Sequence, residues 1–265
     1  MTEQRNPQEG DVERYAQALL SGDEPGLRWG RRMFKRMPSS PRCKMCASPF
    51  AAPMGPVMRV FGKGPWPKNP KYCTQCFNVL LTHRGGTEIE CSLLFADVRG
   101  STTLAETMRP AAFSGLMNRF FETASRVLIA RDAMVDKFVG DEIIGIFLPV
   151  MTGPHHARNA VEAGRDLLVA TGNNMPMPWL PIGIGVNTGV SYVGTVGEGD
   201  NVDITAMGDP VNVAARLASA AGAGEMLITA ETAAAAELAD ADLERRRLDL
   251  KGKSEATEVV VVLAA

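Results

Sequence analysis

The order of strand-like and helix-like segments in residues 88–265 is the feature that most limits the possible folds. Continuous apolar runs bounded by turn residues indicate buried strands, and apolar residues that recur every three or four positions indicate amphipathic helices. In chain order these signals give a strand, a helix, two strands, a helix and a strand: IECSLLFADV, PAAFSGLMNRFFETASRVLIA, AMVDKFV, EIIGIFL, HHARNAVEAGRDLLVAT and LPIGIGVNTG. A further strand, VSYVGTVG, is separated from the last of these at Gly189.

The order β-α-β-β-α-β is that of the ferredoxin-like motif. After it the sequence adds a helix, a strand, a helix and a strand, in DPVNVAARLASAA, EMLIT, ETAAAAELA and TEVVVVL. We therefore predict an α+β fold with a ferredoxin-like core. In the first long helix the spacing predicts one buried face, made of Phe113, Leu116, Met117, Phe120, Phe121, Ala124, Val127 and Leu128.

Composition divides the chain into an N-terminal helical segment (1–40), a module rich in Pro, Gly and Cys (41–85) and the α+β domain (86–265). Of the 265 residues 45% are hydrophobic and 22% are charged, which is typical of a globular protein with a large core. A net charge of -2 argues against a nucleic-acid partner or an anionic membrane. No apolar run is long enough to span a bilayer, and the polar N-terminus does not resemble a secretory signal. We expect no membrane insertion and a cytoplasmic location.

The second helical piece of the N-terminal segment is strongly basic, with Arg28, Arg31, Arg32, Lys35 and Arg36. We expect these side chains to form a solvated helix face. A patch that binds an anion or a partner protein is the alternative.

Four cysteines occur as two pairs, Cys43-x-x-Cys46 and Cys73-x-x-Cys76. Paired CxxC knuckles suit tetrahedral thiolate coordination of one ion, and the second pair opens a helical pattern, as in treble-clef knuckles. We expect a structural Zn²⁺ ion. The alternative is an iron–sulfur cluster, which would make the protein a redox sensor. Cys91 lies inside the first apolar strand and is predicted to be a core residue.

Two aspartates occupy corresponding places in the α+β domain, since Asp97 ends the first strand and Asp141 lies at the tip of a predicted hairpin. In a β-α-β-β motif the first strand lies beside this hairpin, so the two carboxylates can converge. Divalent Mg²⁺ or Mn²⁺ would relieve their repulsion. The next helix opens with backbone N–H groups that could receive phosphate oxygens, those of Gly100, Ser101 and Thr102. From spacing alone, a turn aspartate and a helix cap remain an equally good interpretation.

Five segments in the same order resemble the class III nucleotidyl cyclase catalytic domain: FADVRGSTTLAE, DKFVGDEIIGIF, IGIGVNTGVSYVGTVG, DITAMGDPVNVAARL and LDLKGK. The resemblance covers residues from about 88 to 265. It implies a palm-like ferredoxin fold that works as a head-to-tail homodimer, with active sites at the interface. The implied reaction converts a nucleoside triphosphate to its 3′,5′-cyclic monophosphate and pyrophosphate.

The resemblance also assigns roles to residues. Asp97 and Asp141, with the carbonyl of Val98, would hold two Mg²⁺ or Mn²⁺ ions. The partner chain would supply Asn212 to orient the ribose and Arg216 to stabilise charge on the α-phosphate. Both lie in NVAAR, four positions apart on one helix face.

Three more positions would contact the nucleotide. Lys251 would bind the β- and γ-phosphates. Lys137 and Thr205 take the positions that read the base, and a lysine with a threonine hydroxyl can match adenine N1 and N6. Guanine-specific members of the family that the chain resembles carry a Glu with a Cys or Ser at these two positions instead. One family position departs from the pattern, because Val190 stands where some members carry an arginine aimed at the triphosphate.

The leading prediction is therefore a homodimeric adenylate cyclase that acts on ATP and is modulated by its N-terminal metal module. The alternatives are a guanylate or pyrimidine nucleotidyl cyclase, or a catalytically weak module that senses nucleotides. Asp136 and Glu142, which flank the hairpin turn, gain no role and are expected to be ordinary turn-flanking acids.

Overall fold

The computed structural model describes residues 7–38, 40–67, 69–82, 85–197, 203–238, 243–250 and 256–264. The chain forms two compact units, and each is described by itself. The cysteine unit comprises Met1–Ile89, Leu148–Gly153 and Ser191–Met207. The sheet unit comprises Glu90–Phe147, Pro154–Val190 and Gly208–Ala265.

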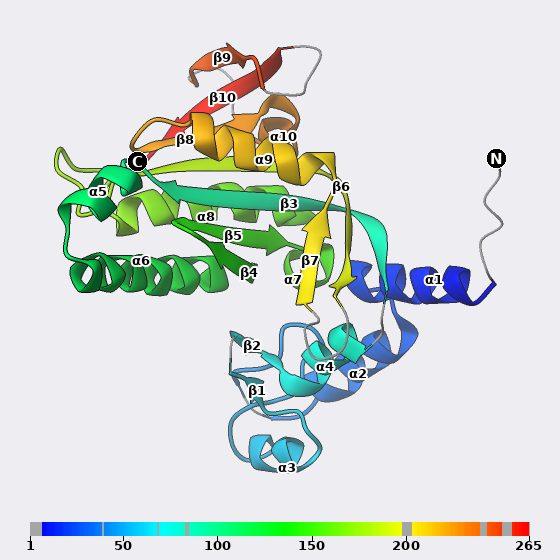
Figure 1. Cartoon of the computed structure of the whole chain (residues 1–265). Coiled ribbons are helices and arrows are strands. Elements are labelled where there is room, and N and C mark those ends of the chain that lie inside the picture. Colours follow the sequence, from blue (N-terminus) through cyan, green and yellow to red (C-terminus); the bar gives the residue numbers. More distant parts are fainter. Residues whose placement is uncertain are drawn as a thin grey trace. The chain divides into compact units, whose positions relative to one another are not determined.

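A mixed sheet forms the centre of the sheet unit (Figure 1). Its strands follow the order β4-β5-β3-β6-β8-β10-β9. Their bounds are β3 (Gly86–Val98), β4 (Met134–Val139), β5 (Glu142–Phe147), β6 (Ile182–Val196), β8 (Glu225–Thr229), β9 (Arg245–Leu248) and β10 (Thr257–Leu263). The first four positions, β4-β5-β3-β6, reproduce the strand order of a ferredoxin-like motif, so the predicted α+β fold is confirmed.

Helices cover both faces of this sheet (Figure 1). They are α5 (Ser101–Thr107), α6 (Pro110–Ala130), α8 (His156–Ala170), α9 (Asp209–Ala220) and α10 (Ala230–Ala235). Helices α6 and α8 pack together over one core, and α9 packs with β8 over a second, smaller one. Strand β10 serves both cores, because Val260 and Val262 face the first and Val259 and Val261 face the second. This double burial explains its uninterrupted valine run.

The predicted buried face of α6 is confirmed. Met117, Phe120, Ala124 and Leu128 are buried in the main core. The other four predicted residues are partly buried against the same core: Phe113, Leu116, Phe121 and Val127.

The predicted break at Gly189 is wrong, because β6 is one continuous strand from Ile182 to Val196. A Cβ at Gly189 would lie 2.9 Å from the Cγ of Pro210, at the start of α9. Glycine therefore permits the close approach of a helix here, and it does not mark a turn. The sequence reading also missed two short strands, β9 and β7 (Asp203–Met207), and β7 pairs antiparallel with the second half of β6.

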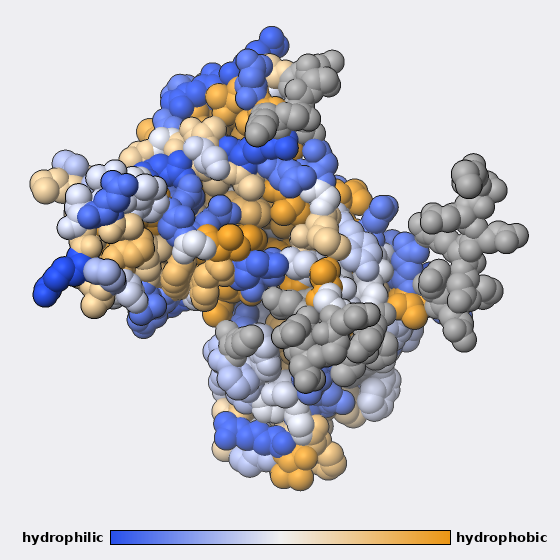
Figure 2. All heavy atoms as spheres, in the orientation of Figure 1, coloured by the Kyte–Doolittle hydropathy of each residue, from blue (hydrophilic) through white to orange (hydrophobic). Residues whose placement is uncertain are grey.

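The cysteine unit is built mainly from short elements. They are α1 (Pro7–Ser21), α2 (Pro25–Lys35), α3 (Gly55–Val60), β1 (Pro65–Trp66), β2 (Asn69–Cys73), α4 (Thr74–Thr82) and α7 (Pro149–Thr152). Helix α2 is capped by the carboxylate of Glu24, which accepts hydrogen bonds from the N–H groups of Gly26 (2.9 Å) and Leu27. Exposed apolar side chains gather over α3, where Val60 and Phe61 are 83% and 66% exposed (Figure 2).

The basic residues of α2 and its C-cap divide into two groups. Arg28, Arg32, Lys35 and Arg36 are exposed, as expected for a solvated face. Arg31 differs, because its guanidinium donates hydrogen bonds to the carbonyls of Met45 and Val150, the second at 3.1 Å. It therefore ties α2 to the first cysteine knuckle and to α7.

Candidate functional site

A two-residue turn places Asp141 at the tip of the β4–β5 hairpin. Val139 pairs with Glu142 across the turn, which leaves Gly140 and Asp141 between the strands. Gly140 has a φ of 62°, a conformation that favours glycine in the first turn position. The turn thus has the geometry that its sequence predicted.

Asp97 and Asp141 are brought together at the end of β3. Strand β3 runs antiparallel to β5, and the N–H of Val98 donates to the carbonyl of Asp141 at 3.4 Å. Burial, opposed by the charge of Arg99 and assisted by the neighbouring Asp141, raises the pKa of Asp97 to about 6. Two carboxyl groups in this arrangement, with the Val98 carbonyl beside them, form a set of hard oxygen donors that suits Mg²⁺ or Mn²⁺.

Glu142 is a third member of this acidic group, and the sequence reading missed it. It pairs with Asp97 in the β3–β5 register, so the two side chains lie on the same face of the sheet. Burial, followed by the charges of Asp97 and Asp141, raises the pKa of Glu142 to about 7. The sequence carried little signal for this, because the two-residue turn fixes only the β4–β5 register, whereas Glu142 meets Asp97 through the β3–β5 register.

Asp136 also differs from the solvated acid that was expected. Its side chain is only 3% exposed, and its Oδ1 lies 3.6 Å from the Nζ of Lys137. Lys137 itself is 39% exposed on β4. The pair shows that the hairpin buries an acid on the strand that carries the predicted base-reading lysine.

Arg99 links the acidic group to α9. Its guanidinium forms an ion pair with the carboxylate of Asp97 and donates to the carbonyls of Ser219 (3.0 Å) and Ala221 (3.2 Å). The cation offsets part of the acidic charge and fixes one oxygen of Asp97. The sequence hinted at this role only by placing an arginine two residues after Asp97.

The residues expected to receive phosphates come shortly after Asp97 in the chain, at the start of α5. Gly100 adopts the left-handed conformation, with a φ of 71°, at the N-cap of α5. Ser101 and Thr102 form the first turn of this helix. They lie within five residues of Asp97 in the chain, and their contact with a phosphate remains a prediction.

Helix α9 carries Asn212, which is exposed, and Arg216, which is half-buried, one turn apart. The start of this helix is anchored by Asn187, whose Nδ2 donates to the carbonyl of Pro210 at 3.0 Å. The Oδ1 of Asn187 accepts a hydrogen bond from the hydroxyl of Thr229 at 2.9 Å. Asn187 is buried, so these bonds fix the position of α9 firmly.

Three of the predicted nucleotide contacts, those of Thr205, Lys137 and Lys251, remain predictions. Thr205 is buried on β7 in the cysteine unit, and Lys137 belongs to the sheet unit, so their pairing remains a prediction. Lys251 lies outside the described residues. Val190, which replaces the family arginine, is 57% exposed.

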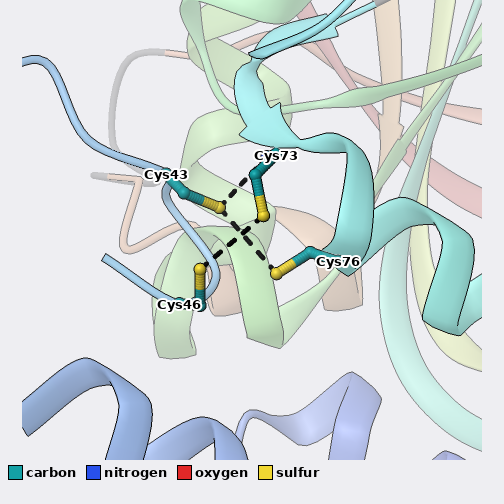
Figure 3. Close-up of side chains that lie close together, drawn as sticks. All are labelled: Cys43, Cys46, Cys73 and Cys76. Atoms are coloured by element: carbon teal, nitrogen blue, oxygen red, sulfur yellow. Dashed lines mark hydrogen bonds between the residues drawn. The ribbon is translucent and has the colours of Figure 1, made fainter. Parts of the chain in front are cut away.

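The four paired cysteines converge in the cysteine unit (Figure 3). The Sγ atoms of Cys43 and Cys76 are 4.0 Å apart, those of Cys46 and Cys73 are 3.7 Å apart, and all four lie within 4.8 Å of one another. A tetrahedral ion with metal–sulfur bonds of about 2.3 Å needs sulfurs about 3.8 Å apart. The cluster therefore fits one tetrahedral metal ion.

The local fold explains this convergence. Cys73 ends β2 and Cys76 lies in the first turn of α4, while Cys43 and Cys46 form a tight turn closed by the hydrogen bond from the Ala47 N–H to the Cys43 carbonyl at 2.8 Å. Hydrogen bonds among the four thiols lower the pKa of Cys43 and raise those of Cys73 and Cys76, so the cluster favours one thiolate, and a bound cation would be needed to hold more. Cys91 is fully buried in β3, as predicted.

Within the described ranges, no helix combines the length and apolar character needed to cross a membrane.

Comparison with known proteins adds independent findings. Residues 86–263 match the family described as adenylate and guanylate cyclase catalytic domain. An adenylate cyclase of Anabaena cylindrica is 30% identical over 131 residues, which are 48% of this chain and only 26% of that protein. The chain thus spans about a quarter of this relative.

The match to two solved structures extends over nearly all of each solved chain. The adenylyl cyclase CyaB from P. aeruginosa is 29% identical with a TM-score of 0.60, over 68% of this chain and 96% of that one. The guanylyl cyclase Cya2 is 26% identical with a TM-score of 0.62, over 68% of this chain and 95% of that one. Similarity therefore extends to cyclases of both base specificities.

Proposed function

Because the chain belongs to the family of adenylate and guanylate cyclase catalytic domains, we propose that it is an adenylate cyclase that converts ATP to 3′,5′-cyclic AMP and pyrophosphate. The observation that carries this proposal is the convergence of the Asp97 and Asp141 carboxyl groups at the end of β3. Their mutual repulsion, together with Glu142, makes the site favourable for divalent cations.

The donor set fits two Mg²⁺ or Mn²⁺ ions, held by Asp97, Asp141 and the Val98 carbonyl. When bound, such ions neutralise triphosphate charge and favour loss of the ribose 3′-OH proton. Arg99 would keep Asp97 oriented by holding one of its oxygens. The backbone N–H groups of Gly100, Ser101 and Thr102, three to five residues after Asp97, would face the phosphates.

A second copy of the chain would complete the site. We expect Asn212 of the partner subunit to orient the ribose and Arg216 of the partner subunit to stabilise charge at the α-phosphate, with Lys251 on the β- and γ-phosphates. Lys137 and Thr205 would read adenine. The anchoring of α9 by Asn187 supports this division, because a fixed helix keeps such contacts in register.

One observation favours a second candidate, a guanylate cyclase: the solved guanylyl cyclase Cya2 resembles this chain as closely as CyaB does. Against it, the base-reading positions hold Lys137 and Thr205, and this pair matches the acceptor and donor of adenine.

We propose that the N-terminal part, a helical segment (1–40) followed by a cysteine module (41–85), regulates the cyclase domain (86–265). The spacing of the four sulfurs favours a single Zn²⁺ ion, because a cluster of several irons holds its cysteines on different metal atoms and further apart.

The test of the function is direct. The purified protein is incubated with Mn²⁺ and each of ATP, GTP, CTP and UTP, and cyclic products are separated by chromatography. We expect cyclic AMP as the main product, and Asp141→Asn should abolish it while the exposed Glu122→Gln control retains it. If the folded protein forms no cyclic product from any of the four nucleotides, the enzyme proposal is wrong, and a nucleotide-binding module remains as the alternative.

A complementation assay tests the shared site. Asp97→Ala and Arg216→Ala proteins should each be inactive alone. Mixed in equal amounts, random pairing makes half the dimers mixed, each with one intact site, so roughly a quarter of wild-type activity returns. No recovery after subunit exchange would contradict a site built from two chains.

A further inference from the structure

The cysteine unit contains a cavity that the proposed reaction does not use. It has a volume of about 250 Å³ and lies between α1, α2 and the two cysteine knuckles. Its walls are mainly apolar, with Leu19, Leu27, Phe34, Met45 and Val79 among the lining residues. Apolar cavities with a few polar groups are the usual form of small-molecule sites.

One charged side chain on the cavity wall, Lys63, has no carboxylate partner among the described residues. The Nζ of Lys63 lies 5.2 Å from the ring centroid of Phe34. The other charged group on the wall is Glu24. Its carboxylate is occupied by the N–H groups of Gly26 and Leu27 at the start of α2. The site therefore presents a free cation beside an apolar interior.

The cysteine cluster forms part of the same wall. Cys46 and Cys76 both line the cavity, so a bound molecule would touch two of the four candidate metal ligands. Trp29 also lines it and is 65% exposed, which places an indole at the opening.

We propose that this cavity binds a small amphipathic carboxylate, with its apolar tail among the side chains of α1 and α2 and its carboxylate on Lys63. The apolar walls select the tail, and the half-buried ammonium selects the anion. At about 30 Å³ for each water-sized group, the cavity holds about eight such groups. An eight-carbon acid therefore matches its size.

The probe is octanoate, titrated into the full chain while tryptophan emission is followed, and Trp29→Phe identifies the part of the signal that comes from the cavity opening. We expect a saturable change with a Kd of about 0.1–1 mM, the range that a ligand of this size can reach. Octan-1-ol, which has the same tail without the charge, should bind at least tenfold more weakly, and octylammonium should not bind. Equal affinity for octanoate and octan-1-ol would overturn the proposal, and so would the absence of saturation.

Variants locate the anion contact. Lys63→Met keeps the apolar stem and should weaken octanoate binding at least tenfold, while Lys63→Arg should retain most of it. Lys44→Met is the matched control, because Lys44 is exposed in the same module and does not line the cavity. Unchanged affinity in Lys63→Met, with a wild-type circular dichroism spectrum, would also overturn the proposal. Because no turnover is measured, the result is independent of the cyclase activity.

Discussion

Replacing Glu142 with glutamine should stabilise the metal-free protein, and the gain should grow with pH. Burial and the charges of Asp97 and Asp141 raise the pKa of Glu142 from an ordinary value of 4.5 to about 7. A carboxyl group whose pKa is higher in the folded state destabilises that state once it ionises. The penalty is absent below about pH 4.5, grows as the pH rises, and is complete above about pH 7.

The size of the effect follows from the same two values. A rise from 4.5 to about 7 corresponds to about 3 kcal/mol at about 1.4 kcal/mol for each pKa unit. Because Glu142 is only half-buried, solvent screening reduces this to about 1–2 kcal/mol. For a domain of this size each kcal/mol moves the melting temperature by about 2–4 °C, so Glu142→Gln should melt about 2–8 °C higher at pH 8.

Thermal unfolding of both proteins in buffer without Mg²⁺ or Mn²⁺, from pH 5 to pH 8, measures this directly. Added Mn²⁺ should shrink the difference, because the cation relieves the repulsion that glutamine removes. Glu122→Gln, on the exposed face of α6, controls for the loss of a negative charge elsewhere. A variant that melts no higher than wild type at pH 8, or gains equally at both pH values, would refute the reasoning.

Three further changes test other contacts. Arg99→Gln should weaken Mn²⁺ binding about tenfold in calorimetry, because the oxygen of Asp97 that it fixes becomes free to turn; unchanged affinity would remove the orienting role. Cys73→Ser should lose its metal and lower the stability of the cysteine unit, and elemental analysis of the wild type should show one zinc per chain, whereas iron with sulfide absorption would contradict zinc. Asn187→Ala should lower kcat more than it raises KM for ATP, because α9 loses its anchor at Pro210; a change in KM alone would count against that anchor.

Local patterns predicted the parts of the fold that depend on local chemistry. The spacing of α6 identified its buried face, and glycine before Asp141 identified the two-residue turn. The two CxxC pairs indicated a shared metal site, and their sulfurs do converge. In each case the deciding interaction lies within a few residues of chain, or depends on residue types with few other uses.

The missed features depend on contacts between distant segments. Gly189 has the appearance of a turn residue, yet its role is to let Pro210 approach β6. Arg31 has the appearance of a solvated helix residue, yet its acceptors come from positions 45 and 150. Neither partner can be identified from the residues around the glycine or the arginine, so propensity alone favoured the more common interpretation.

Glu142 depends on both a local turn and a distant strand pairing, and it adds to the negative charge of the site. The turn at Gly140 fixes the β4–β5 register, and the pairing of β5 with the distant strand β3 places a third carboxyl group beside Asp97. The fold thus concentrates negative charge where a core sheet would ordinarily place apolar side chains, and it does so at a cost in stability that rises toward neutral pH. Binding of divalent cations would remove that cost, so the free energy that destabilises the empty site would become part of the driving force for cation binding.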